Sequence, residues 1–335
     1  MTVSSSVINS GMGPVPTERI ETSRPVVPSG RRGIIVLRIL HCRSSNLDGM
    51  LALDVAGEAR AGPARDGIAV VSRERDVAKS GRAVGVIPAR LQSTRLPRKL
   101  LLDETGRVLL EYAWEAACRA SLLDEVLVAA DSPEIVSAVE AFGGRAILTG
   151  EHSSGTDRVA EVVARCCGDV DTIVNVQGDE PELDPDHIDS LVEALENDRG
   201  LQMATLACPI RDRDTLEDPS CVKVVVGIDG RALYFSRHPI PYVRDGKAET
   251  LLNGESPWLL HVGLYAYRRD YLLELTRLPV SPLEQLEQLE QLRALQHGAS
   301  IGVRVAEHSA VGIDTPEDYA RFVARTQNSR EGRAA

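Results

Sequence analysis

Four cationic side chains and two hydroxyl groups lie within ten residues of one another, directly after an apolar run at residues 83–87. Residues 88–100 read Pro-Ala-Arg-Leu-Gln-Ser-Thr-Arg-Leu-Pro-Arg-Lys-Leu. Guanidinium, ammonium and hydroxyl groups donate hydrogen bonds to phosphate oxygens, so this loop suits a polyphosphate. It matches neither GxGxxG nor the P-loop, and a solvated basic surface loop is the alternative. The donors are Arg90, Ser93, Thr94, Arg95, Arg98 and Lys99.

Two carboxylates occupy similar places much further along the chain. Asp179 follows the apolar run 173–176 in Gln-Gly-Asp-Glu-Pro, and Asp314 stands between an apolar segment and a helix start in Gly-Ile-Asp-Thr-Pro-Glu-Asp. Carboxylates at strand ends can hold a hard cation such as Mg²⁺ beside a phosphate, and two of them could share one metal. For each acid alone, a turn or a helix N-cap is the competing interpretation.

A third polar segment, Ser-Gly-Thr-Asp-Arg at residues 154–158, stands at a predicted helix start. Backbone amides and hydroxyls at such a position can bind the base or ribose edge of a nucleotide. A plain N-cap by Ser154 or Thr156 is the alternative, and one residue can serve both purposes. We place Gln177 close to the same pocket.

The elements that must position these residues follow an alternating pattern, which predicts an α/β fold with a Rossmann-like, mostly parallel central sheet and helices on both faces. Strands are predicted at 83–87, 125–130, 145–148, 172–176 and 203–208, and helices at 109–121, 133–142, 156–166 and 186–197. From residue 222 the pattern predicts a smaller antiparallel or mixed extension, with strands at 222–226, 232–236 and 261–268. A helix at 282–297, a strand at 301–306 and a helix after Thr315 complete the fold.

The stretch 283–292 repeats Leu-Glu-Gln. Leucines at every third residue drift around a helix of 3.6 residues per turn and cannot maintain the seam of a coiled coil. We therefore predict a single helix packed within the domain or at a dimer contact.

Residues 1–82 show no sustained helix or strand period and are predicted to be a disordered N-terminal extension or the result of a start codon assigned too far upstream. Residues 83–330 are predicted to form one domain. The first segment carries 12 basic and 8 acidic residues, or +4, so the total of -11 leaves -15 for the remainder. This acidic balance argues against binding to a nucleic-acid backbone.

No apolar run approaches the ~20 residues of a membrane span, and the run 33–40 lies too far from Met1 for an ordinary signal peptide. The six cysteines include no CxxC pair and are interpreted as reduced packing residues. A cytoplasmic protein is expected.

The motifs PARxxSTRLPxK, SGTDR, VNVQGDEP, YFSR, HxGxYxY, SPLEQ and DTPED occur in this order over residues 83–325. As an ordered set, they resemble the 3-deoxy-manno-octulosonate cytidylyltransferase (CMP-Kdo synthetase) family. The resemblance implies a nucleotidyltransferase fold and a homodimer. It also implies a reaction in which the anomeric hydroxyl of 3-deoxy-manno-octulosonate (Kdo) attacks the α-phosphate of CTP, with Mg²⁺ as cofactor.

The resemblance also implies roles for individual residues. Asp179 and Asp314 would hold Mg²⁺, and together with Arg90 and Lys99 they would form the catalytic set. The nucleotide would contact Ala89, Arg90, Ser93, Arg95, Lys99, Ser154, Gly155, Thr156, Arg158 and Gln177. The sugar acid would contact Arg237, His261, Tyr265, Glu284 and Gln285. A related acid sugar, such as 8-amino-Kdo or a nonulosonic acid, and a non-catalytic nucleotide sensor are the alternative functions.

The chain departs from the family pattern in one place, where Leu-Pro-Gly-Lys-Pro-Leu becomes Leu-Pro-Arg-Lys-Leu-Leu at residues 96–101. An ordinary negative φ at Arg98 would leave the loop unstrained. A positive φ would strain it and make the role of Lys99 less secure.

Overall fold

A computed structural model of the protein describes residues 81–93, 95–245, 248–254 and 256–334. The predictions for residues 1–80 and for Thr94 lie outside the described residues. The strands are β1 (Ala83–Ala89), β2 (Glu125–Ala130), β3 (Arg145–Leu148), β4 (Thr172–Asn175), β5 (Met203–Pro209), β6 (Lys223–Val226), β7 (Ala232–Ser236), β8 (Leu259–Arg268) and β9 (Ile301–Val305).

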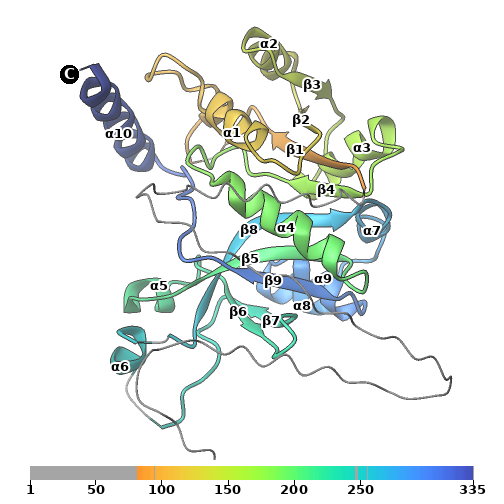
Figure 1. The fold of residues 1–335 in the computed structure, drawn as a ribbon, viewed down its shortest axis with the longest axis vertical. Helices are drawn as coiled ribbons and strands as arrows, with labels where there is room; N and C mark the ends of the chain where they lie inside the picture. Colours follow the sequence, from red (N-terminus) through yellow and green to blue (C-terminus); the bar gives the residue numbers. More distant parts are fainter. Residues whose placement is uncertain (1–80, 94, 246–247, 255, 335) are drawn as a thin grey trace, which may run out of the picture. The chain divides into compact units, whose positions relative to one another are not determined.

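Helices follow most of the strands along the chain, although β6 is followed directly by β7 (Figure 1). They are the short 3₁₀ turn η1 (Lys99–Leu101), α1 (Leu109–Cys118), α2 (Pro133–Ala141), α3 (Gly155–Cys166), α4 (Pro185–Asn197), α5 (Arg213–Glu217), α6 (Ala248–Leu252), α7 (Arg269–Leu275), α8 (Pro282–Glu287), α9 (Gln291–Gln296) and α10 (Pro316–Ala334). Helices α7, α8 and α9 are consecutive along the chain.

The strands form one sheet in the order β3-β2-β1-β4-β8-β5-β9. β8 is antiparallel to both of its neighbours in this order, and all the other strands in it run in one direction. β6 pairs antiparallel with β8 and β7, which makes the smaller extension. The predicted α/β fold class, with a mostly parallel sheet and a mixed extension, is confirmed.

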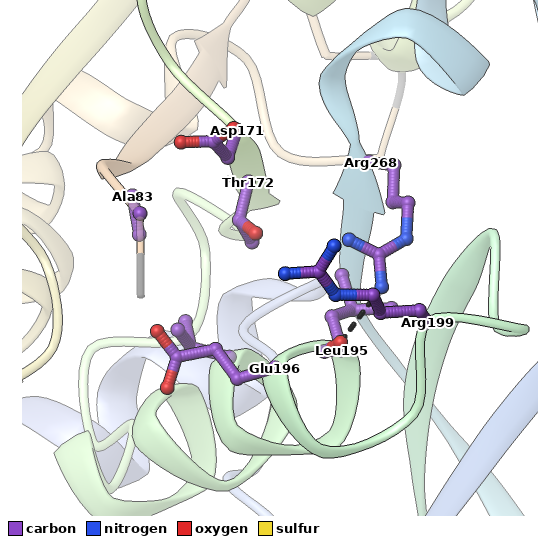
Figure 2. Close-up of a pocket in the computed structure, with 9 residues that line it drawn as sticks. Ala83, Asp171, Thr172, Leu195, Glu196, Arg199 and Arg268 are labelled. Atoms are coloured by element: carbon purple, nitrogen blue, oxygen red, sulfur yellow. Dashed lines mark hydrogen bonds between the residues drawn. The ribbon is translucent and has the colours of Figure 1, made fainter. Parts of the chain in front are cut away.

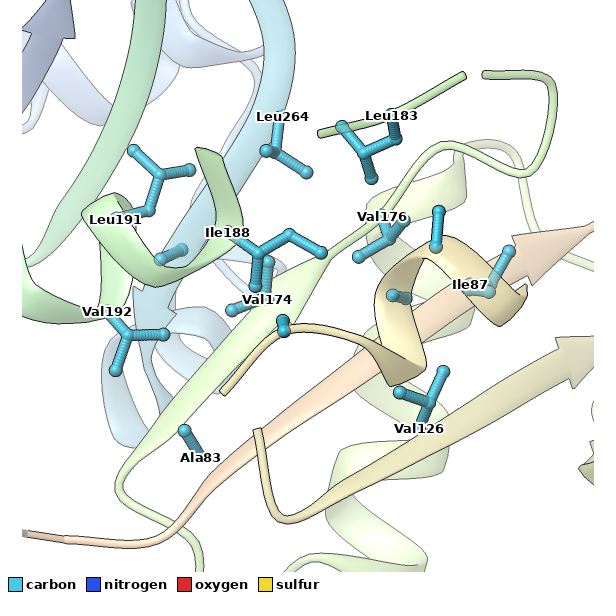
Figure 3. Packing of buried hydrophobic residues seen from close by; sticks show 14 of the residues in the cluster. Ala83, Ile87, Val126, Val174, Val176, Leu183, Ile188, Leu191, Val192 and Leu264 are labelled. Carbon is cyan, nitrogen blue, oxygen red and sulfur yellow. The ribbon is translucent and has the colours of Figure 1, made fainter. Parts of the chain in front are cut away.

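Alternation of side chains along the strands divides the core between the two faces of the sheet. On one face, Ile87 of β1 and Val174 of β4 pack with Ile188 and Leu191 of α4 (Figure 3). On the other face, Val86 of β1 packs in the cluster that contains α3 and α7. Helices therefore cover both faces, as predicted.

Two parallel neighbours, β1 and β4, determine where a ligand can bind. Val86 pairs with Asn175, so the carboxyl ends of the two strands reach the same edge of the sheet. The loop after Ala89 and the loop that contains Asp179 leave the sheet beside each other. Ligands of open α/β sheets bind at such an edge.

The prediction of one helix over residues 282–297 was wrong, because the chain forms α8 and α9 with a break between them. Gln288 ends α8 in the left-handed conformation with φ 54°. The break forms a corner in the Leu-Glu-Gln repeat, so the successive Glu-Gln pairs have different surroundings. Among the described residues, no helix is both long and apolar enough to cross a bilayer.

Candidate active site

A cavity of about 570 Å³ lies at the edge of the sheet where β1 and β4 end. Its lining comes from the basic loop, the start of α3, the loop after β4, the corner between α8 and α9, and the segment before α10. These lining residues are Pro88, Arg90, Gln92, Ser93, Arg95, Lys99, Leu100, Ser153, Ser154, Gly155, Gln177, Gly178, Asp179, Glu290 and Asp314. The structure therefore brings together all four residues of the predicted catalytic set.

Lys99 forms the centre of the charge arrangement in this cavity. Its Nζ lies 2.6 Å from Oδ2 of Asp179 and 2.9 Å from Oδ1 of Asp314. Burial would lower the pKa of Lys99, but the charges of the two aspartates and their hydrogen bonds outweigh it and raise the pKa above its usual value. The ammonium group is therefore charged and is shared by two carboxylates.

Backbone contacts hold the two carboxylates at this position. The Ile313 amide donates to the Asp179 carbonyl at 2.9 Å, which fastens the segment before α10 to the loop after β4. The Asp314 amide donates to Asp318 at 3.2 Å, and Arg95 donates to Oδ2 of Asp314 at 3.0 Å. Asp314 is thus fixed from both its backbone and its side chain.

The two aspartates fit a divalent metal with oxygen ligands. Oδ2 of Asp179 and Oδ1 of Asp314 both contact one cationic atom, so they already point to a common position. No group of three or more metal-binding side chains (His, Cys, Asp or Glu) occurs within the described residues. A metal here would therefore take its remaining ligands from water and substrate phosphate, the arrangement that Mg²⁺ commonly adopts.

Glu180, next to Asp179, experiences a different environment. Burial, with a further contribution from the Asp179 charge, raises its pKa to about 8. Its Oε2 atom is buried without a hydrogen-bond partner. Of two adjacent acids, only Asp179 lines the cavity.

The start of α3 forms a second wall of the cavity. Ser154 caps the helix by accepting a hydrogen bond from the Asp157 amide at 3.1 Å. A Cβ atom added at Gly155 would come within 3.4 Å of Pro88, so glycine permits the close approach of α3 to β1. Gln177 extends from the opposite side, where its Nε2 donates to the Gly263 carbonyl at 2.9 Å.

Three residues predicted to bind the nucleotide do not line the cavity. Ala89 is buried at the end of β1, and Thr156 donates to Glu290 at 2.7 Å. Arg158 is only 2% exposed, donating to the Gly150 carbonyl at 3.2 Å and to Thr149. They lie beside or beneath the residues that form the cavity surface.

The residues predicted to bind the sugar are distributed differently. Arg237 donates to the carbonyls of Glu287 at 2.7 Å, Pro219 at 3.0 Å and Gln288 at 3.2 Å, and does not line the cavity. Nε2 of His261 lies 3.1 Å from Oγ1 of Thr205, and burial lowers the His261 pKa to about 3, so this imidazole is neutral.

Tyr265 stacks beside His261, with ring centroids 5.4 Å apart. Glu284 and Gln285 line a neighbouring cavity of about 290 Å³, which shares Ser153, Ser154 and Glu290 with the larger one. The predicted sugar-binding residues are thus divided between strand β8, the end of β7 and this second cavity.

Glu290 is one of the lining residues that sequence reasoning missed, together with Ser153 and Gly178. The repeat contains Glu-Gln pairs at 284–285, 287–288 and 290–291, and the resemblance was applied to the first of them. Of these six residues, only Glu290 lines both cavities, and it accepts the hydrogen bond from Thr156 at 2.7 Å. The three Glu-Gln pairs can be distinguished only when the break in the helix at Gln288 is known.

A further cavity, of about 330 Å³, lies at the opposite ends of β1 and β4 (Figure 2). Arg268 borders it and donates to the carbonyls of Leu195 and Leu201, each at 2.8 Å, so this guanidinium caps the end of α4. None of the predicted site residues lines this cavity. Its lining is Gly81, Ala83, Asp171, Thr172, Val192, Leu195, Glu196, Arg199 and Arg268.

Arg98 has the positive φ that the sequence analysis identified as the unfavourable case, with φ 56° and ψ 27°. Its guanidinium pairs with Glu134, where Nη1 lies 3.1 Å from Oε2. The side chain points away from the cavity lining, while Lys99, the next residue, enters the cavity. Arg98 therefore adopts a left-handed backbone conformation that glycine would adopt more easily.

We expect Arg98→Gly to be more stable than Arg98→Ala by about 1 kcal/mol. Both variants lose the pair with Glu134, but only glycine adopts the observed φ of 56° at little cost. Urea unfolding followed by circular dichroism measures the difference. Identical midpoints for the two variants would show that position 98 carries no backbone strain.

A family model described as cytidylyltransferase matches residues 84–301. The 3-deoxy-manno-octulosonate cytidylyltransferase of Rhodopirellula baltica is 49% identical over 245 residues, covering 72% of this chain and 98% of that protein. The enzyme of the same name from Syntrophobacter fumaroxidans is 48% identical over 244 residues, covering 72% and 96%.

Among solved structures, a CMP:2-keto-3-deoxy-manno-octonic acid synthetase complexed with CTP is 42% identical, with a TM-score of 0.68. The match covers 74% of this chain and 99% of that one. The similarity therefore extends over nearly the whole length of each of these proteins. The chain belongs to the cytidylyltransferase family, among the 3-deoxy-manno-octulosonate cytidylyltransferases, and is a nucleotidyltransferase.

Proposed function

We propose that the protein transfers CMP from CTP to the anomeric hydroxyl of Kdo, giving CMP-Kdo and pyrophosphate. The observation that carries the proposal is the convergence of Asp179 and Asp314 on one cation position in a cavity lined by Arg90 and Arg95. Relatives named for this reaction, and a solved relative complexed with CTP, support the choice of nucleotide and sugar.

The cationic residues of the loop would bind the triphosphate. Arg90, Arg95 and Ser93 line one side of the cavity and present hydrogen-bond donors to phosphate oxygens. Their positive charge would offset the charge that accumulates on the leaving pyrophosphate. The bond from the α-phosphorus to its bridging oxygen breaks as the bond to the sugar oxygen forms.

Mg²⁺ is the cofactor that we propose for Asp179 and Asp314. When bound, it would neutralise phosphate charge and lower the pKa of the sugar hydroxyl, so that no side-chain base is required. The two carboxylates would hold it, and Lys99 would contribute its charge to the phosphates. Positioning and electrostatic stabilisation would then supply most of the rate acceleration.

We place the sugar acid beside the nucleotide, toward Gln177 and Glu290, which line the cavity from elements other than the basic loop. Amide and carboxylate groups suit a ligand with many hydroxyl groups. The predicted sugar-binding residues Glu284 and Gln285 line the adjoining cavity. Arg237, His261 and Tyr265 would act from outside the cavity lining.

The test is an assay of the purified full chain with CTP, Mg²⁺ and a panel of acid sugars that includes Kdo, 8-amino-Kdo and a nonulosonic acid. We expect stoichiometric release of pyrophosphate and formation of CMP-Kdo, with the largest kcat/KM for Kdo. A larger kcat/KM for another acid sugar would change the substrate assignment. Binding of CTP in calorimetry without product from any sugar would indicate a nucleotide sensor and overturn the proposal.

A further inference from the structure

We infer that Lys99 acts as an internal competitor for the metal site, so that a divalent cation binds tightly only together with the nucleotide triphosphate. The inference rests on the proposed function, because it assumes that Asp179 and Asp314 are the metal ligands. It concerns the free enzyme and the order in which the site fills, which the proposed reaction leaves undetermined.

The competition follows from the atoms that Lys99 contacts. Its Nζ lies 2.6 Å from Asp179 Oδ2 and 2.9 Å from Asp314 Oδ1, which are the two oxygen atoms that converge on a single position. A divalent cation bound by both oxygens would occupy nearly the same place as the ammonium group. The two cations would also repel each other at such short range.

The Lys99 contacts are partly protected from water. The Lys99 side chain is only 11% exposed, compared with 28% for Asp179 and 44% for Asp314, so the contact with Asp179 is the better protected of the two. An ion pair at this depth is screened less than a surface pair. A free metal ion would have to displace the ammonium and lose part of its own hydration shell, which Mg²⁺ gives up reluctantly. Metal binding to the free enzyme is therefore weakened.

A triphosphate would provide Lys99 with another set of anionic oxygens. Leu100, the next residue, is buried, so the backbone of this turn is anchored while the flexible lysine side chain can reorient. Arg90 and Ser93 line the same cavity and would hold the phosphates within reach. Movement of Nζ from the carboxylates to the phosphates would free Oδ2 of Asp179 and Oδ1 of Asp314 for the metal, while Arg95 still contacts Oδ2 of Asp314.

This exchange couples the two ligands thermodynamically. If CTP increases the affinity for metal by releasing the carboxylates, then the metal must increase the affinity for CTP by the same factor. The expected coupling is roughly tenfold or greater, the usual range for linked sites. Part of any such coupling comes from direct contact between metal and phosphate, so a variant is required to isolate the contribution of Lys99.

The experiment measures Mn²⁺ binding to the full chain without nucleotide, by electron paramagnetic resonance of the free ion. Wild type is compared with Lys99→Met, which keeps an unbranched side chain one atom shorter but removes its charge. The control is Arg90→Gln, which removes one positive charge from the same cavity. We expect Lys99→Met to bind Mn²⁺ about tenfold more tightly than wild type, and Arg90→Gln to show a much smaller gain.

Equal Mn²⁺ affinities for wild type and Lys99→Met would refute the inference, as would an equal gain in Arg90→Gln. Thermal unfolding with and without Mn²⁺ gives a second measurement. Because each protein is compared with itself, the Tm shift caused by the metal can be used even if the substitution changes the stability of the metal-free protein. The increase in Tm caused by the metal should be larger in Lys99→Met than in wild type. This binding measurement does not depend on the product assay. Tight Mn²⁺ binding to the wild-type protein in the absence of nucleotide would therefore refute this inference and leave the proposed function unaffected.

Discussion

Asp179→Asn is expected to lower kcat by about a thousandfold, which is the size of effect seen when a group that stabilises transition-state charge is removed. The amide keeps the shape of the side chain but has no charge to hold a divalent cation. Asp179 Oδ2 is also one of only two carboxylate oxygens that contact Lys99 among the described residues. Pyrophosphate release with CTP, Mg²⁺ and Kdo measures the loss.

The matched control for this prediction is Glu182→Gln, which removes one negative charge from the same loop. Glu182 is exposed and pairs with Arg325 of α10 at 2.8 Å, outside the cavity lining. We expect its kcat to stay close to wild type and the unfolding midpoints of both variants to stay close together. Full activity in Asp179→Asn would contradict the assignment of Asp179 as a metal ligand.

Glu284→Ala is expected to destabilise the protein by about 3 kcal/mol, because removal of one partner leaves the other buried charge unpaired. Oε2 of Glu284 accepts from Nε of Arg293 at 2.7 Å, and the two side chains are only 9% and 16% exposed. Glu284 also completes the capping box of α8 with Ser281. Its hydrogen bonds with Arg293 lower the Glu284 pKa despite the opposing effect of burial.

Urea unfolding measures this loss of stability, with Gln285→Ala as the control. Gln285 is the exposed neighbour of Glu284 on the same helix, so its truncation should change the free energy of unfolding by less than about 0.5 kcal/mol. Similar midpoints for the two alanine variants would show that the pair between Glu284 and Arg293 contributes little to folding.

The sequence predicted most of the fold because hydrophobic periodicity and strand ends are local properties. The ranges predicted for β2, β3 and β7 are those observed, Pro133 begins α2 as predicted, and α4 begins at Pro185, one residue before the predicted start. Short helices were missed, including α5 and α7, since one or two turns carry too little periodicity. The corner at Gln288 was also missed, because a left-handed glutamine has no sequence signature comparable to glycine.

The convergence of the four residues proposed as catalytic was predictable because each member follows a strand or begins a helix at one edge of a parallel sheet. Arg90, Lys99, Asp179 and Asp314 all line the one cavity. The positions of the residues proposed to bind the sugar were harder to predict, since they depend on how α8 and α9 turn. A repeat gives Glu284 and Glu290 almost identical local sequence, and only the tertiary arrangement buries the first while leaving the second at the cavity.

The contact between Lys99 and Asp314 joins residues that are 215 positions apart. At a synthesis rate of ~5–20 residues per second, roughly 10–40 seconds separate the appearance of the two residues on the ribosome. Asp179, 80 positions after Lys99, is made during that interval, and from then on a nascent chain has the basic loop and Asp179 but lacks the second carboxylate. The growing polypeptide therefore cannot complete the pair of carboxylates around Lys99 until the segment that begins α10 has left the exit tunnel.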